Sequence, residues 1–134
     1  MKNYTIVALA ALLVFIGSSC LLAADNNAAV EALRKLNIEV IGPAEQTEEQ
    51  LPDKLNGPYW GYLNNTCRDS GWDLSAYAGK KISSTCFPIQ EKFGDEPLNV
   101  WVLSSAEKTV CIYKAVREGS SLVPGIFPVK NTVR

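Results

Sequence analysis

The sequence predicts an α+β fold in which two helices pack on one face of a small, mainly antiparallel sheet. Apolar residues recur at helical spacing over residues 26–37 and again over 57–71. Three later stretches, between residues 81 and 116, alternate or run apolar as strands do. Packing both helices against one face of an antiparallel sheet is the economical way to bury these patterns together.

Residues 1–24 have the pattern of an export signal. Lys2 supplies a short positive start, and an apolar run with small alanines extends from Ile6 to Ile16. Small residues follow, and the segment ends at Ala24. We therefore expect the protein to leave the cytoplasm, with residues 25–134 as a single domain that is secreted, periplasmic or anchored to a membrane as a lipoprotein.

Two routes of processing compete for this segment. Small residues precede Cys20 as in a lipoprotein box, which makes Cys20 a candidate for lipidation. Cleavage after Ala23 or Ala24 would instead satisfy the small-residue rule and release a secreted protein. A third alternative is an uncleaved anchor, since residues 4–24 are just long enough to span a membrane.

The first helix is expected to begin at Asn26 or Asn27, either of which can cap it. Its apolar stripe consists of Ala29, Val30, Leu33 and Leu36. Asn37 is a suitable left-handed stop. Residues 38–41 then read as a short strand that ends at Gly42-Pro43.

Residues 43–56 are polar and acidic and contain two prolines, which predicts an acidic loop. The second helix is expected to start at Gly57-Pro58, because a proline in the first turn loses no hydrogen bond. Gly71 should end it. Its apolar stripe is formed by Tyr59, Tyr62, Leu63 and Thr66.

Three strands are expected after the second helix, at residues 81–89, 98–103 and 109–116. Residues 104–108 form a good hairpin loop between the last two strands. Residues 119–134 are expected to be a tail or an edge element of the sheet.

Composition excludes several classes of function. The net charge is -1, so nothing here would hold a nucleic-acid backbone. The chain contains no histidine, which rules out Ser-His-Asp and Cys-His mechanisms within it. No pair of cysteines has a metal-binding spacing. We therefore predict no metal, no cofactor and no catalytic residue; Cys67 beside Arg68 is the one remaining nucleophile candidate.

The candidate ligand-binding residues are aromatic. Tyr59, Trp60 and Tyr62 lie close together on the second predicted helix, and a helix buries only one face. An exposed Trp60 beside tyrosine could bind a sugar, a peptide or a lipid surface. The alternative is that Trp60 covers the acidic loop. Trp72, after the helix, is the fourth candidate.

A resemblance to a known family rests on residues 71–81, which read Gly-Trp-Asp-Leu-Ser-Ala-Tyr-Ala-Gly-Lys-Lys. This segment resembles a Gly-aromatic-Asp-Leu-Ser-x-Tyr-x-Gly-Lys signature of small exported bacterial proteins, catalogued as a domain of unknown function. The resemblance covers about residues 28–116; the ending at residues 123–127 differs from the family pattern. It implies the fold and an exported protein, mostly lipoproteins and anchored proteins of Gram-positive bacteria, and no activity.

The physical interpretation of this signature is structural. Gly71 supplies the turn after the helix, and Asp73 and Ser75 can satisfy backbone donors. Gly79 allows a tight entry into the next strand. The seam between helix and sheet would be filled by Trp72, Leu74 and Tyr77.

Three cysteines follow the signal, and an oxidising compartment favours pairing two of them. Side chains along a strand alternate between the two faces of a sheet. This strand parity places Cys86 and Cys111 on one face, away from the helices, with Cys67 over the other face. Cys86–Cys111 is then the candidate disulfide. If the strands form a simple meander, a strand separates those two cysteines, and Cys67–Cys86 is the alternative.

Taken together, these features predict a non-enzymatic binding module of the cell envelope or extracellular space. Its partner would be a protein, a peptide or a glycan, and it would meet a membrane only through its signal or a lipid anchor. One alternative is a small secreted enzyme or thiol-dependent protein. Another is a secreted inhibitor or immunity factor.

Overall fold

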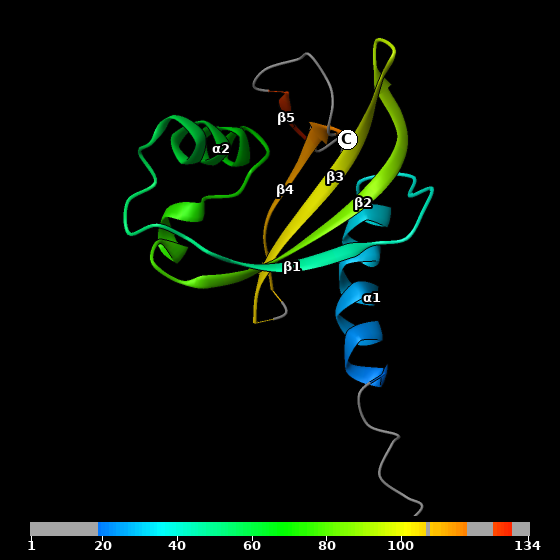
Figure 1. Cartoon of the computed structure of the whole chain (residues 1–134), viewed down its shortest axis with the longest axis horizontal. Helices are drawn as coiled ribbons and strands as arrows, with labels where there is room; N and C mark the ends of the chain where they lie inside the picture. Colours follow the sequence, from blue (N-terminus) through cyan, green and yellow to red (C-terminus); the bar gives the residue numbers. More distant parts are fainter. Residues whose placement is uncertain (1–18, 107, 118–124, 130–134) are drawn as a thin grey trace, which may run out of the picture.

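The fold is built on an antiparallel sheet of five strands in the order β1-β2-β3-β4-β5, so each strand pairs with its neighbour in the chain (Figure 1). The computed structural model describes residues 19–106, 108–117 and 125–129. Its elements are α1 (Ser19–Lys35), β1 (Glu45–Gln50), α2 (Pro58–Asp69), the short 3-10 helix η1 (Leu74–Tyr77), β2 (Lys81–Phe93), β3 (Glu96–Ser105), β4 (Lys108–Val116) and β5 (Ile126–Pro128).

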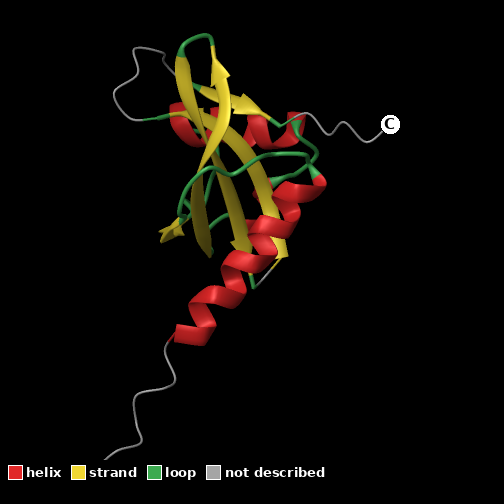
Figure 2. Cartoon of the chain, turned by 90° about the vertical axis from the view of Figure 1, so that its right-hand side faces the viewer, coloured by secondary structure: helices red, strands yellow, loops and turns green. Residues whose placement is uncertain are grey.

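The predicted α+β class and the antiparallel pairing are confirmed, but the two helices do not share a face of the sheet. The α2-side cluster consists of Leu51, Leu63, Cys67, Leu74, Ile82, Leu103, Val110, Cys111, Tyr113 and Ile126. The α1-side cluster consists of Ala29, Leu33, Phe87, Ile89, Leu98, Val100, Val102, Ile112 and Val129. Figure 2 shows the sheet between α1 in front and α2 behind.

The reason for this two-sided packing is that the central strands are apolar on both faces. In β3, Val100 and Val102 point to the α1 side, while Leu103 points to the α2 side. All three are almost fully buried. Successive residues of a strand point to opposite faces, so each face of β3 needs its own cover.

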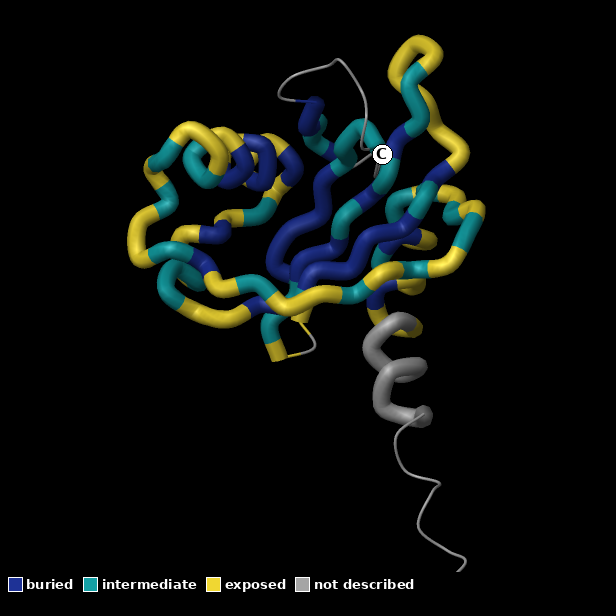
Figure 3. Tube along the Cα trace, viewed as in Figure 1, coloured by how far each residue is buried: buried dark blue, intermediate teal, exposed yellow. Residues whose placement is uncertain are grey.

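The predicted acidic loop is wrong in its central part, because residues 45–50 form strand β1. This strand pairs with β2 in a register that runs from Glu45 opposite Cys86 to Gln50 opposite Lys81. It lies at the edge of the sheet, and its residues are exposed or half-buried (Figure 3). The expected strand at residues 38–41 is reduced to one bridge between Val40 and Ile89.

Helix α1 is already formed before Asn26 and Asn27, so neither residue caps it as expected; it extends from the first described residue, Ser19, to Lys35. Leucine and alanine at residues 21–24 are good helix formers, in agreement with a helix over these residues. Its predicted stop is confirmed, since Asn37 has φ 57°. Cys20 falls in the first turn of α1, where only the backbone is described, and residues 1–18 of the predicted signal lie outside the described residues. No helix in the described ranges is long and apolar enough to cross a membrane.

The remaining boundaries follow the sequence closely. Helix α2 begins at Pro58, and Gly71 turns the chain after it with φ 96°. Strands β3 and β4 pair as the predicted hairpin, and Ala106, directly after β3, has φ 47°. Of residues 119–134, only 125–129 are described; they include β5, which is an edge strand beside β4.

Candidate functional site

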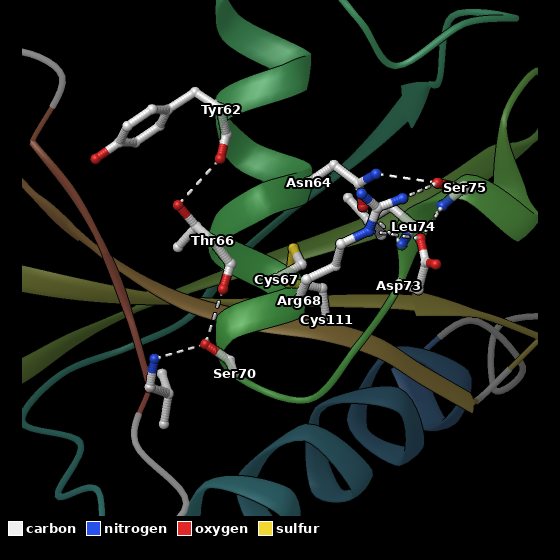
Figure 4. Close-up of a disulfide and its surroundings, with 11 residues drawn as sticks. Tyr62, Asn64, Thr66, Cys67, Arg68, Ser70, Asp73, Leu74, Ser75 and Cys111 are labelled. Carbon is white, nitrogen blue, oxygen red and sulfur yellow. Dashed lines mark hydrogen bonds and ion pairs between the residues drawn. A yellow bond between two sulfur atoms is a disulfide. The ribbon is translucent and has the colours of Figure 1, made fainter.

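A disulfide between Cys67 and Cys111 fixes α2 to β4, with 5.6 Å between the two Cα atoms (Figure 4). Both cysteines are fully buried. The two pairings expected from the sequence, Cys86–Cys111 and Cys67–Cys86, are therefore both wrong. Of the three cysteines whose side chains the structure describes, Cys86 is the unpaired one.

The physical reason lies in the strand order and the position of α2. Because the sheet is a meander, β3 separates Cys86 on β2 from Cys111 on β4. Parity does place these two cysteines on one face, as predicted. That face, however, is the one that α2 covers, which brings Cys67 directly over Cys111.

Cys86 is a buried thiol with 8% of its surface exposed. Burial raises its pKa from 9.0 to about 11, and the negative charge of Glu45 adds to the increase. Asn99, by hydrogen bonding, and Arg117, by its charge, act in the opposite direction. Cys86 is consequently protonated at neutral pH and is a poor nucleophile.

We expect native Cys86 to react with iodoacetamide at about pH 8 roughly 100-fold more slowly than the urea-unfolded protein, because two pKa units lower the thiolate fraction by that factor. Mass spectrometry of the Cys86 peptide measures both rates. Since the folded state holds this proton more tightly, the free energy of unfolding should fall as pH rises from about 9 to about 11. Equal native and unfolded rates would contradict the burial of Cys86.

The polar side of α2 is joined to the segment after it by a network around Ser75 (Figure 4). The buried Asn64 side chain accepts a hydrogen bond from the Leu74 N–H at 3.0 Å and donates to Ser75 Oγ at 3.0 Å. Arg68 donates to the same Oγ at 3.1 Å, and its Nε lies 3.6 Å from Asp73 Oδ1. These bonds hold η1 against α2.

Asp73 caps η1, as the sequence predicted, by accepting a hydrogen bond from the Ser75 N–H at 2.9 Å. This backbone bond, with the Ser75 side chain and the Arg68 charge, lowers the pKa of Asp73. Leu74 is fully buried in the α2-side cluster, and Tyr77 packs against it. Gly79 has φ 75°, and an added Cβ there would lie 2.9 Å from Asp53 Oδ1, so the tight entry into β2 requires glycine.

The opposite side of α2 is joined to the segment around β5. Ser70 Oγ donates to the Thr66 carbonyl at 3.1 Å and accepts from the Val129 N–H at 2.8 Å. The Tyr62 hydroxyl donates to the Ile126 carbonyl at 3.4 Å. Helix α2 is thus held on both sides as well as by the disulfide beneath it.

The four predicted aromatic residues do not form one site. Tyr59 and Tyr62 are exposed, at 51% and 43%. Trp60 packs partly into the α2-side cluster and contacts Tyr59 edge-on, with 5.0 Å between ring centroids. Trp72 follows the far end of α2, a helix of 12 residues that is roughly 18 Å long. It is half-buried and contacts both core clusters.

Tyr59 is linked to the core below it. Tyr59 is only partly exposed, and its partial burial and the charge of Glu49 raise its pKa, while a hydrogen bond with Tyr113 lowers it. Burial raises the pKa of Tyr113 as well, and the Tyr113 ring stacks on Trp101 with 6.3 Å between centroids. Both phenols are therefore neutral at physiological pH.

Sequence reasoning missed a polar hollow of about 450 Å³, which lies on the side of α2 that carries Asn64 and Arg68. Its lining comes from the segment before α2, the outer face of α2, and η1 with the residue after it. The lining residues are Asp53, Leu55, Asn56, Gly61, Asn64, Asn65, Arg68, Ser75 and Ala78. A usable signal was present, because Gly61, Asn64, Asn65 and Arg68 recur at helical spacing on one face.

Fold and site together define a disulfide-linked α+β domain with a meander sheet and one helix on each face. The chain belongs to the family DUF4830, a domain of unknown function, which matches residues 33–115. This match extends from the end of α1 to β4 and includes both cysteines of the disulfide. The search found no match among curated proteins or solved structures.

Proposed function

We propose that the protein is a non-enzymatic binding module that works outside the cytoplasm. The observation that carries this proposal is the buried Cys67–Cys111 disulfide. Disulfides form and persist in oxidising environments and are rare in the cytosol. The charged start and apolar run of residues 1–24 agree with export.

Binding is favoured over catalysis by the state of the nucleophile candidates. Cys67, which the sequence offered beside Arg68, is consumed by the disulfide and fully buried. Cys86 is protonated at neutral pH. The chain has no histidine to activate either thiol. The exposed tyrosines and the polar hollow, by contrast, leave α2 with two surfaces on which a partner can rest.

Export is tested on protein recovered from its native host. We expect N-terminal sequencing to give a start at Ala24 or Asp25, as in secretion, or a blocked, detergent-soluble Cys20, as in lipidation. Non-reducing peptide mapping should recover Cys67 and Cys111 in one linked pair. Protein from the cytosol with Met1 intact and free thiols would overturn the proposal.

Binding is tested by immobilising the processed protein and exposing it to an envelope extract. We expect the immobilised protein to retain one partner, and this binding should saturate. An excess of the free, processed protein should release the partner by competition. A screen for hydrolase and thiol–disulfide exchange activity is the counter-test. Robust turnover that is lost in Cys86→Ser would show an enzyme instead of a binding module.

A further inference from the structure

The hollow beside α2 has walls that are fixed by hydrogen bonds of their own. Asn64 uses both ends of its amide internally, toward Leu74 and Ser75. Arg68 is held through Ser75 Oγ and through Asp73. Because these side chains are already in place, a ligand would not have to order them on binding, which removes part of the entropic cost of binding.

Free hydrogen-bonding groups remain around this fixed wall. Arg68 has five N–H donors, and the contacts above leave some of them unused. The side chains of Asn56 and Asn65 are exposed and each offers two donors and an acceptor. Asp53 adds an exposed carboxylate. Leu55 and Ala78 contribute small apolar patches.

The hollow is balanced in charge, which selects the class of ligand. Among the lining residues, Arg68 and Asp53 carry opposite charges, so the lining has no net charge. Asp73, which lies outside the lining, pairs with Arg68 and weakens its attraction for an anion. An anion would therefore gain little attraction there, and the single exposed carboxylate of Asp53 attracts a cation only weakly in water. The volume of about 450 Å³ lies in the range of small-molecule sites, roughly 300 to 1,000 Å³. Such sites are mostly apolar, whereas this one is polar.

We propose that this hollow binds a neutral saccharide of one or two rings. Amide, carboxylate and guanidinium groups are planar and can each make paired hydrogen bonds, which neighbouring hydroxyls of a sugar can match. The apolar patches of Leu55 and Ala78 suit the C–H face of a ring. The site rests on the proposed function as an exported binding module and gives that module its ligand class.

The absence of a side chain at Gly61 keeps one wall of the hollow open. A Cβ placed at Gly61 would lie 3.4 Å from the backbone carbon of Asn56. Gly61→Ala should therefore narrow the hollow while it favours the helix, since alanine is a better helix former than glycine. A loss of ligand binding in this variant cannot be attributed to a weaker fold if its stability is measured to be equal or higher.

The test is a titration of the processed, isotope-labelled protein with N-acetylglucosamine, maltose and cellobiose, followed by NMR. We expect millimolar binding by at least one sugar, with shifts centred on the side-chain amides of Asn56 and Asn65. Asn65→Ala should weaken binding about fivefold, which corresponds to roughly 1 kcal/mol for one neutral hydrogen bond. The matched control is Asn27→Ala, an exposed position on α1, which should leave binding unchanged.

Three results would overturn the proposal. The first is the absence of shifts at the hollow with all three sugars. The second is sugar binding that Asn65→Ala and Gly61→Ala do not weaken. The third is tighter binding of the dipeptide Ala-Ala or of inorganic phosphate than of any sugar. A partner captured from envelope extract alongside any of these results would leave the proposed binding function standing and remove only the saccharide.

Discussion

Replacing both Cys67 and Cys111 by alanine is expected to lower the free energy of unfolding by about 4 kcal/mol. The disulfide closes a loop with a sequence separation of 44. Closing a loop of this length removes about that much conformational entropy from the unfolded chain. Because a small domain is stable by only about 5 to 15 kcal/mol, the loss is large. Urea unfolding of the oxidised protein and of the double variant measures it.

The control for this prediction is Cys86→Ala, which removes a buried sulfur but leaves the disulfide intact. We expect it to cost roughly 1 kcal/mol, as small cavities in a core do. Adding a reductant should destabilise the wild-type protein and the Cys86 variant but not the double variant. A wild-type unfolding midpoint that reductant does not move would show that the bond is not formed in solution.

Leu33→Ala is expected to lower the free energy of unfolding by about 3 kcal/mol. Leu33 is fully buried and joins α1 to the cluster on its side of the sheet. Truncating it removes apolar contacts and leaves a cavity between helix and sheet. The expected loss is measured by urea unfolding followed by circular dichroism.

Val30→Ala provides the comparison on the same helix. Val30 is 36% exposed, so its truncation should cost less than about 1 kcal/mol, partly offset by the better helix propensity of alanine. Equal losses at the two positions would mean that α1 does not pack on the sheet through Leu33.

The helices and the three central strands could be predicted because their residues repeat with a clear period. Helical spacing identified α2, and Pro58 and Gly71 gave its ends. Alternation identified β2 and β4. Such local patterns depend on neighbours in the chain, and a single sequence contains them in full.

Strand β1 could not be predicted in this way. Its sequence, Glu-Gln-Thr-Glu-Glu-Gln, has no apolar face and low strand propensity. It is a strand because its backbone pairs with β2, which is a contact between distant parts of the chain. With three carboxylates in six residues, this segment has the composition of a loop. A prediction from neighbouring residues alone therefore assigns it as one.

The disulfide and the hollow were missed for a related reason. Parity correctly put Cys86 and Cys111 on one face, but parity does not say which helix covers that face. Apolar residues on both faces of β3 were the overlooked signal that each face needs a helix. The spacing of residues 61, 64, 65 and 68 could have shown one wall of the hollow, on α2. The other walls depend on where η1 and the chain before α2 lie beside that helix, which no local pattern contains.

The acidic edge strand also affects how the protein behaves in a crowded solution. An uncovered strand edge offers a row of backbone donors and acceptors to any other extended chain, which is the usual start of aggregation. Two copies that met along β1 would bring Glu45, Glu48 and Glu49 of each close to those of the other. The repulsion between these carboxylates opposes growth of the sheet from molecule to molecule. At the other side, β5 has only three residues, which is too short a template for a stable sixth strand.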